Sequence, residues 1–372
     1  MKDLKPMGAV TALYAPDQHE LAEAIIASLS QAIFTDSDPK AASKAMLLMS
    51  RISQKVVHWT TRTHTVVDHL GSAATHFRNP LMEGSGHPYA QALMTSSQSE
   101  TAALVEGGDP MNGPYMMLAP EIRKNGGWWD RVFLDSVQGK DVQVRFVHET
   151  QATYLAAKRV LERGDCVRIK AVAAGTGLSL ILAYDRLVRD GFDPKSITAI
   201  ITDRDPANAV KSNFLLAKLA NTRDQHHLLS LNYGISAVSE DVFNGPDLQE
   251  SPYDIVTAIG ILEYFQGVTH GTTEKRMMLH EPQESQTAHH LAERLSEMTM
   301  DGGKLIINTY RDHSSIRILE VFGKRFDFRN REHLNDLLAP LNFRSVGLVG
   351  SGHIYDVEVF EKMPRVTGSD IR

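Results

Sequence analysis

Apolar residues follow two different periods along the chain, and the change of period divides it into two parts. Over roughly the first 130 residues hydrophobic positions recur every three to four residues, which predicts amphipathic helices. One example is the stripe Leu21, Ile25, Leu29 and Ile33. We therefore expect a helical N-terminal domain, or a cap over a substrate site, at residues 1–135.

From residue 143 onward, helical stretches alternate with short runs rich in β-branched residues. A helix is expected at 143–163, ended by Gly164, because glycine is common just after a helix. Further helices are expected at 178–189, 206–219 and 332–338, and strands at 167–174, 197–202, 235–238, 253–259, 303–308, 344–348 and 354–360. Such alternation indicates a parallel sheet with right-handed crossovers. The prediction is a Rossmann-like α/β domain at 140–363, followed by a flexible tail at 364–372.

The last two predicted strands are separated only by a short Gly-Ser-Gly segment. This spacing predicts an antiparallel hairpin at the end of the sheet. The polar segment 266–290, which contains four histidines, is expected to be an insertion over the site or a surface loop. The histidines are irregularly spaced, so no metal site is predicted.

Composition narrows the classes of function. The chain has 372 residues, 42% of them hydrophobic and 23% charged, with a formal charge of −6, as in a globular protein that contains two domains. No basic block occurs, so no nucleic-acid partner is expected. The single cysteine, Cys166, excludes an intramolecular disulfide and a multi-cysteine zinc site. No apolar run reaches about 18 residues, so no membrane span is expected, and a cytoplasmic location is the default.

A glycine-containing turn follows the first predicted strand, in the segment Val172-Ala173-Ala174-Gly175-Thr176-Gly177-Leu178. Glycines at this point let a ligand approach the backbone, and the next helix presents free N–H groups. A plain tight turn would give the same pattern. The dinucleotide fingerprint requires a third glycine where this chain has Leu180, which argues against NAD or FAD.

Two carboxylates stand at the end of the second predicted strand. Asp203 is placed to accept hydrogen bonds from both hydroxyls of a ribose. Asp205 precedes Pro206 and a helix, so it is expected to be an N-cap.

Two further segments end at the same sheet edge. Asp241 and Val242 follow the third strand, where a carboxylate and a backbone N–H can contact an adenine edge; an exposed acidic loop is the alternative. Gly260 to Tyr264 follow the apolar strand Tyr253-Asp254-Ile255-Val256. Ligands of open α/β sheets bind at the carboxyl ends of the strands, so all four features predict one ligand site.

The order of these motifs, followed by Gly302-Gly303-Lys304-Leu305, resembles class I S-adenosylmethionine-dependent methyltransferases over roughly residues 143–362. The resemblance implies S-adenosyl-L-methionine as the cofactor. It places Gly175 and Gly177, with Ala173 beside them, under the methionine part and Asp203, with Arg204, at the ribose. Asp241 and Val242 would face adenine, and Gly260 and Ile261 would border the reacting methyl group.

A shorter resemblance concerns the acceptor. The segment from Gly260 to Phe265, together with Arg145, resembles bacterial synthases of 3-hydroxy fatty acid methyl esters. It implies methyl transfer to a small molecule such as a carboxylate or a fatty-acid-like compound, with Arg145 at the substrate. A carboxylate nucleophile needs little acid–base help, whereas a hydroxyl or amine needs a base, for which the candidates are Glu263, Tyr264 and His313.

The N-terminal part supplies the remaining candidates. Tyr115, Trp128 and Trp129 are expected to line an apolar substrate pocket, with interdomain packing as the alternative. In the resembled fold an N-terminal helical extension caps the site. The same helices could form a homodimer interface.

Three alternatives remain open from the sequence. Asp203 to Asn208 resemble a segment of nicotianamine synthase-like enzymes, which transfer the aminocarboxypropyl group of the same cofactor. An NAD-dependent oxidoreductase is the second alternative, and a non-catalytic methyltransferase-like binding module is the third. The third is suggested by Ala173 and Ala174, which stand where many members of the resembled family carry an acidic residue that contacts the methionine amine.

Overall fold

The computed structural model describes residues 30, 33–34, 137–222, 234–244, 252–265, 287–313 and 326–364. The chain divides into two compact units, 1–144 with 274–281 and 312–326, and 145–273 with 282–311 and 327–372. Apart from Ser30 and Ile33, which are helical, the helices expected at 1–135 lie outside the described residues, as does the tail after Pro364. The proposed boundary near residue 135 stays a prediction.

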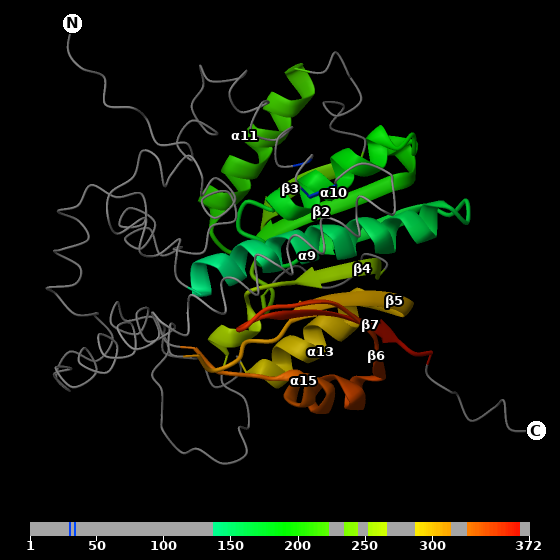
Figure 1. Cartoon of the computed structure of the whole chain (residues 1–372). Coiled ribbons are helices and arrows are strands. Elements are labelled where there is room, and N and C mark those ends of the chain that lie inside the picture. The colour runs from blue at the N-terminus through cyan, green and yellow to red at the C-terminus, as the bar shows by residue number, and fades with distance from the viewer. Residues whose placement is uncertain are drawn as a thin grey trace, which may run out of the picture. The chain divides into compact units, whose positions relative to one another are not determined.

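One seven-stranded sheet forms the centre of the second unit, in the order β3-β2-β1-β4-β5-β7-β6 (Figure 1). The strands are β1 (Val167–Ala171), β2 (Ile197–Asp203), β3 (Ile235–Ser239), β4 (Tyr253–Ala258), β5 (Thr299–Asn308), β6 (Phe343–Ser351) and β7 (Asp356–Lys362). β1 to β5 pair in parallel, and β7 is antiparallel to both β5 and β6. The predicted Rossmann-like fold with a C-terminal antiparallel hairpin is confirmed.

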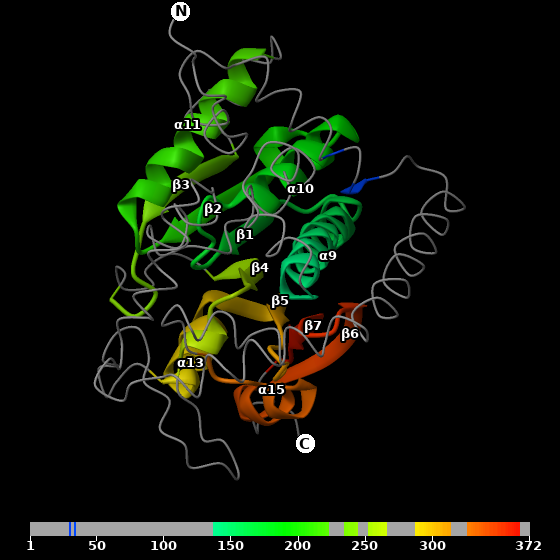
Figure 2. The same ribbon diagram turned by 60° about the vertical axis from the view of Figure 1, so that its left-hand side comes forward.

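Helices cover both faces of this sheet. They are α9 (Val137–Leu161), α10 (Leu178–Arg189), α11 (Pro206–Thr222), α13 (Ala288–Met298) and α15 (Arg331–Leu338), with short 3-10 turns η2 (Pro194–Ser196), η3 (Leu262–Tyr264) and η5 (Ala339–Leu341). α9 lies with α10 on one face, and α13 lies with α15 on the other (Figures 1 and 2). Right-handed crossovers account for this, because the chain moves outward from β1 through β2 to β3 and in the opposite direction from β4 to β5.

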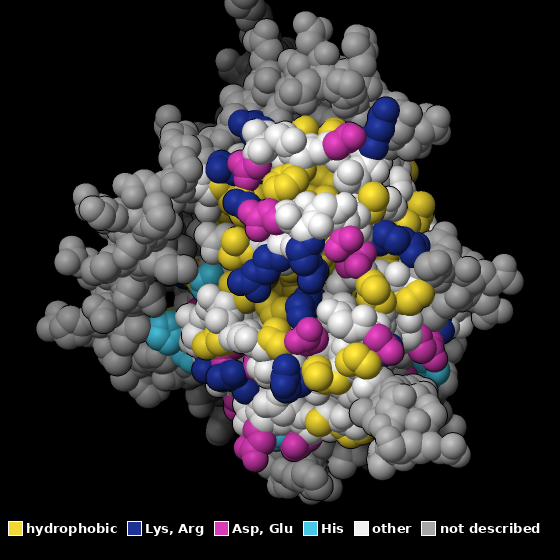
Figure 3. Space-filling view, turned by 90° about the vertical axis from the view of Figure 1, so that its right-hand side faces the viewer, with side chains coloured by type: hydrophobic (Ala, Val, Ile, Leu, Met, Phe, Trp, Pro, Cys, Tyr) yellow, Lys and Arg dark blue, Asp and Glu magenta, His cyan; other side chains and the backbone are white. Residues whose placement is uncertain are grey.

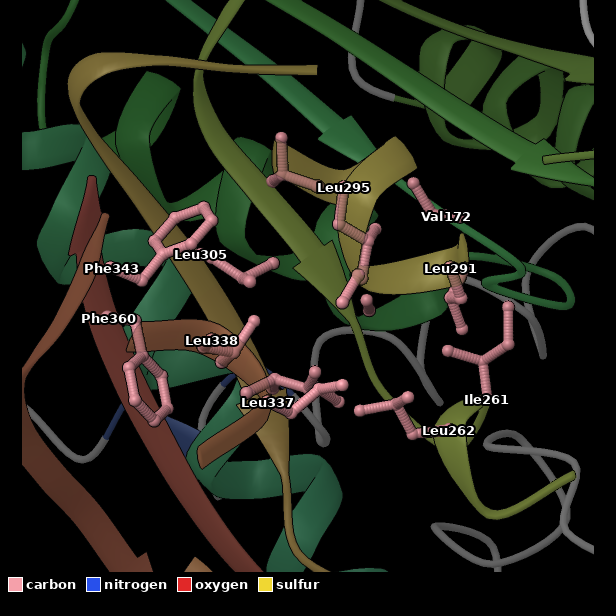
Figure 4. Close-up of a cluster of buried hydrophobic side chains, with 14 of the residues drawn as sticks. Val172, Ile261, Leu262, Leu291, Leu295, Leu305, Leu337, Leu338, Phe343 and Phe360 are labelled. Carbon is pink, nitrogen blue, oxygen red and sulfur yellow. The ribbon is translucent and has the colours of Figure 1, made fainter. Parts of the chain in front are cut away.

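The packing of α13 and α15 on the sheet creates a continuous apolar cluster (Figure 4). Every second residue of β4 and β5 points into it, because side chains alternate across a strand. The cluster includes Val256, Ala258, Leu291, Leu295, Leu305, Ile307, Leu337, Leu338, Phe343 and Phe360. It fixes β4 against β5, and therefore fixes the loop that leaves the carboxyl end of β4.

α13 was missed by the sequence analysis, which assigned residues up to 290 to a polar insertion. The helix begins at Ala288, and the side chain of Thr287 caps it by accepting a hydrogen bond from the N–H of His290 at 3.1 Å. The apolar stripe that buries this helix lies mostly beyond residue 290, so the polar start concealed it.

Several strand boundaries also differ from expectation: β5 begins at Thr299 rather than at residue 303, and the largest consequences are at β1 and in the hairpin. β1 ends at Ala171 rather than at residue 174, because Ala173 has a φ of +50°, which breaks extended structure. In the hairpin, Gly350 and Ser351 still pair with β7, at Val357 and Asp356. The turn is therefore Gly352–Tyr355, and not the Gly-Ser-Gly segment.

Surface charges of both signs lie close together. In Figure 3, Lys and Arg side chains gather near the centre of the face shown, with Asp and Glu side chains around them. Ion pairs such as Lys304–Glu361, at 2.8 Å, combine the two signs. No helix in the described ranges is long and apolar enough to cross a lipid bilayer.

The apolar cluster yields a stability prediction. Leu295→Ala removes a side chain with 0% exposure from α13, so we expect a loss of about 2–5 kcal/mol in the free energy of unfolding. Leu155→Ala is the matched control, because Leu155 is also helical but 47% exposed, and its change should stay within about 0.5 kcal/mol. Urea unfolding followed by circular dichroism measures both, and equal losses would contradict the described packing.

Candidate functional site

The candidate site lies at the topological switch point of the sheet. Crossovers leave β1 and β4, which are neighbours, in opposite directions, and ligands of open α/β sheets bind at the carboxyl ends of such a strand pair. Two predicted segments meet there, the glycine turn after β1 and the segment Gly260–Tyr264 after β4. Both belong to the second compact unit.

The glycine turn has left-handed backbone at every second residue. Ala173, Gly175 and Gly177 have φ values of +50°, +57° and +61°. A Cβ on Gly177 would lie 2.5 Å from Cγ2 of the buried Ile201, so the turn packs directly on β2. Ala173 is strained, because an L-residue with a Cβ rarely adopts this conformation.

Asp203, at the end of β2, holds this turn in place. Its Oδ2 accepts a hydrogen bond from the N–H of Gly175 at 2.8 Å, and the N–H of Ala174 donates to the carbonyl of Thr202 at 3.0 Å. Its Oδ1 accepts from the N–H of Asp205 at 2.9 Å and from Nδ2 of Asn208 at 3.2 Å. Three of about four acceptor positions on the carboxylate are thus used within the chain. Contact with a ribose stays a prediction, and one hydrogen bond to a diol fits better than two.

The neighbours of Asp203 have different roles. The Oδ1 of Asp205 accepts from the N–H of Ala207 at 2.9 Å, which confirms the predicted cap of α11. Arg204 is exposed, and its carbonyl accepts a hydrogen bond from Ser239 at 3.3 Å.

Asp241 and Val242 form a tight turn after β3. Asp241 accepts from the N–H of Phe243 at 2.9 Å, and the carbonyl of Val242 accepts from Nε of Arg294 at 3.2 Å. The side chain of Val242 packs against the apolar cluster. Their assignment to adenine stays a prediction.

Gly260 adjoins the guanidinium of Arg145, which comes from α9. A Cβ on Gly260 would lie 3.2 Å from Nη1 and Nη2 of Arg145. Gly260 has a φ of +77°, and its N–H donates to Oδ1 of Asn308 at 2.7 Å. The Cζ of Arg145 lies 4.4 Å from the ring centroid of Tyr355. Glycine is thus needed where the arginine lies against the backbone, and α9 and β4 meet at this point.

Glu263 is the buried carboxyl group of this site. It is 3% exposed, and its Oε1 lies 3.5 Å from Nη1 of Arg145, a long ion pair. Its Oε2 is buried and accepts no hydrogen bond from the described residues. Burial raises the pKa of Glu263, and the positive charge of Arg145 opposes that rise. A carboxyl group with these properties is a candidate for proton transfer.

Three contributors were missed by the sequence analysis. Asn308 ends β5, and Arg329 is a buried arginine that donates to the carbonyl of Leu262 at 2.6 Å. Glu149 lies in α9, 8% exposed, and accepts a hydrogen bond from Oγ of Ser179 at 2.7 Å. Glu149 lies one helical turn after Arg145. Two charged residues at i and i+4 share one face of a helix, so this spacing could have identified Glu149 from the sequence.

Other predicted residues are less well placed by the structure. Ile261 is buried in the apolar cluster, and Tyr264 is half-buried in η3. His313 is half-buried and belongs to the first compact unit, so its catalytic assignment stays a prediction. Tyr115, Trp128 and Trp129 lie outside the described residues.

The histidine-containing segment is described only from Thr287 onward. There, His289 is exposed and His290 lies against the ring of Phe243, with 5.2 Å between centroids. Within the described ranges, no group of three or more His, Cys, Asp or Glu side chains is placed to hold a metal ion.

No family model and no curated protein sequence matches the chain. Among solved structures it is similar to the CMeT domain of the citrinin polyketide synthase, with 12% identity and a TM-score of 0.46 over 92% of this chain and 98% of that one. It is similar to human N-acetylserotonin methyltransferase in complex with SAM, with 14% identity and a TM-score of 0.41 over 84% and 71%. It is also similar to magnesium protoporphyrin IX methyltransferase from Synechocystis PCC 6803 with bound SAH, with 12% identity and a TM-score of 0.38 over 63% and 92%.

The contact between Gly177 and Ile201 generates a second prediction. Gly177→Ala adds a Cβ in left-handed backbone and against a buried side chain, so we expect a loss of about 2–4 kcal/mol in the free energy of unfolding. Gly191→Ala is the control, because Gly191 has a φ of +94° but nothing within 4 Å of its Cβ position, and it should lose only about 1–2 kcal/mol. Urea unfolding compares them. If Gly177→Ala loses no more free energy of unfolding than the control, the turn does not pack closely on β2.

Glu263 generates a prediction for pH dependence. Its pKa is raised in the folded state above the ordinary value of 4.5, so the stability that its protonated form contributes is present below pH 4.5 and is lost as the pH rises through the folded pKa. Glu263→Gln cannot titrate. We expect the free energy of unfolding of the wild type, relative to this variant, to fall as the pH rises from 4.5 towards neutrality. Denaturant titrations at a series of pH values measure the difference; a constant difference would contradict the raised pKa.

Proposed function

We propose that this chain is an S-adenosylmethionine-dependent methyltransferase that acts on a small molecule. The observation that carries the proposal is the convergence at the switch point of the left-handed turn held by Asp203 and of the buried pair formed by Arg145 and Glu263. The sheet order brings the two features together, and the hydrogen bonds and the ion pair of these side chains hold each of them in place. A strained non-glycine residue, Ala173, at the same place is typical of a functional site.

The residues present fit the proposed cofactor at both ends of the turn. Gly175 and Gly177 would let the backbone lie close to its methionine part, and Asp203 has one acceptor position left for a ribose hydroxyl. The turn leads directly into α10, whose first N–H groups have no helical partners. Val242 and Asp241 would border the base.

S-adenosylmethionine supplies, when bound, a methyl group activated by the positive sulfur. The chain's own residues would align the acceptor and exclude water, which supplies most of the rate for such a transfer. Arg145 is a buried cation, and among the described residues its ion pair, to Glu263, is long, at 3.5 Å, so it can bind a carboxylate. We therefore propose a carboxylate-containing, apolar acceptor, with Arg145 at its carboxylate. Glu263 would act as the base if the acceptor reacts through a hydroxyl or amine.

A second chemistry is compatible with the same cofactor. Asn208 contacts Asp203 in the segment that resembles nicotianamine synthase-like enzymes, and aminocarboxypropyl transfer is the reaction that this resemblance implies. Product analysis separates the two. Methyl transfer leaves S-adenosylhomocysteine, whereas aminocarboxypropyl transfer leaves methylthioadenosine.

Cofactor binding is the direct test. We expect S-adenosylhomocysteine to bind the wild type in calorimetry at submillimolar concentration. Gly175→Val should abolish binding, because a β-branched residue cannot easily adopt a φ of +57° beside the ligand. Gly164→Val is the matched control, since Gly164 also has positive φ, at +84°, and nothing lies within 4 Å of its Cβ position.

The outcomes distinguish the hypotheses. Absence of binding to the folded wild type would overturn the proposed cofactor. Loss of binding in both glycine variants would indicate a general effect of the substitution rather than a site at the turn. Circular dichroism spectra and melting temperatures establish that each variant is folded. Binding without turnover of any carboxylate tested would favour the non-catalytic module.

A further inference from the structure

A buried carboxylate from α9 lies next to the glycine turn. The Oε1 of Glu149 accepts a hydrogen bond from Oγ of Ser179 at 2.7 Å. Ser179 stands in the first turn of α10, two residues after Gly177. Glu149 is only 8% exposed and Ser179 only 5%. The residues between β1 and Gly175 are Val172, Ala173 and Ala174, none of which is acidic. The fold instead brings an acidic side chain to the glycine turn from α9.

Two buried carboxyl groups, Glu149 and Glu263, share one arginine near this point. Arg145 is the arginine that they share, because the charges of both Glu149 and Glu263 act on it. Arg329 pairs with Asp327 at 3.3 Å, and Arg145 lies nearest to Glu263, at 3.5 Å. The carboxyl group of Glu149 accepts its hydrogen bond from a neutral hydroxyl, that of Ser179. Among the described residues, Glu149 is therefore the less compensated of the two carboxyl groups, since it forms no ion pair and only the more distant charge of Arg145 offsets its own.

A second observation concerns the neighbouring carboxyl group, Glu263. The Oε2 of Glu263 is buried without a hydrogen bond from the described residues, so the pair of carboxyl groups around Arg145 is incompletely satisfied. Burial also raises the pKa of Glu149. Buried carboxylates are costly unless a cation or several donors compensate them. A positively charged ligand would lower this cost.

We propose that Glu149 binds the α-ammonium group of the cofactor, and that α9 thereby supplies the acidic contact that β1 lacks. This inference rests on the proposed function. Of the two positive groups of S-adenosylmethionine, only the ammonium carries hydrogens that a carboxylate can accept, and it offers three donors.

Two ligands that differ at this group test the proposal. S-adenosylhomocysteine carries the ammonium, whereas 5′-methylthioadenosine keeps the nucleoside and sulfur but lacks the amino acid. In calorimetry, Glu149→Gln should weaken binding of S-adenosylhomocysteine by about tenfold to a hundredfold, as expected for lost hydrogen bonds to a charged group. The same variant should bind methylthioadenosine within about twofold of the wild type, because that ligand does not reach the carboxylate.

Matched variants control for charge and for folding. Glu162→Gln removes an exposed carboxylate just beyond the end of α9 and should leave both affinities unchanged. Ser179→Ala removes the hydroxyl donor but keeps the carboxylate, so it should retain most of the affinity for S-adenosylhomocysteine. If Glu149→Gln fails to fold, Glu149→Asp replaces it. This shorter side chain keeps the charge, and it should weaken the binding of S-adenosylhomocysteine but not that of methylthioadenosine.

Each result has a definite meaning. Unchanged binding of S-adenosylhomocysteine to Glu149→Gln would overturn this inference and leave the proposed function intact. Equal weakening of the binding of both ligands would also overturn it, since Glu149 would then support the structure of the site without contacting the amino group. Failure of the wild type to bind S-adenosylhomocysteine would instead overturn the proposed function, and this inference with it.

Discussion

The hydrogen bond from the N–H of Gly175 to the carboxylate of Asp203 fixes the geometry on which the candidate site depends. It ties the turn after β1 to the end of β2, across the same strand pair that brings Ile201 against Gly177. Left-handed residues at every second position bend the chain sharply between strand and helix. The turn is therefore held by its neighbours, and the strain at Ala173 is sustained by them.

The same constraint fixes the position of the turn relative to the neighbouring strands. The turn is bonded to β2 on one side of β1, and β4 is the strand on the other side of β1. After β4, Gly260 leaves space for the guanidinium of Arg145. The apolar cluster beneath β4 and β5 holds that loop from the other face of the sheet. Buried charges then gather at one point, from α9, from η3 and from the segment before α15. Burial raises the pKa of both Glu149 and Glu263 there, because it disfavours the charged form of a carboxyl group.

The sequence predicted the elements well wherever periodicity was unbroken. α10 occupies the residues expected, because its apolar stripe and the glycines around it are strong local signals. α13 was missed because its first residues are polar and its buried face begins only at Leu291. β1 was predicted too long, since alanines before Gly175 carry no local mark of left-handed backbone. The antiparallel hairpin was predicted, but its turn was misplaced, because pairing with β7 extends β6 through Gly350 and Ser351.

By itself the sequence determined the order of the strands and of the helices other than α13, the α/β class, and the edge of the sheet at which the motifs gather. These follow from local periodicity and from the rule that crossovers are right-handed. Only the tertiary structure decided which groups meet at that edge. In the structure, Asp203 accepts hydrogen bonds from the chain's own N–H groups. Arg145 lies against Gly260, more than 100 residues away, and Glu149 contacts the start of α10. Such contacts depend on how α9 packs across the sheet, and no local pattern encodes a pairing between side chains so distant in the chain.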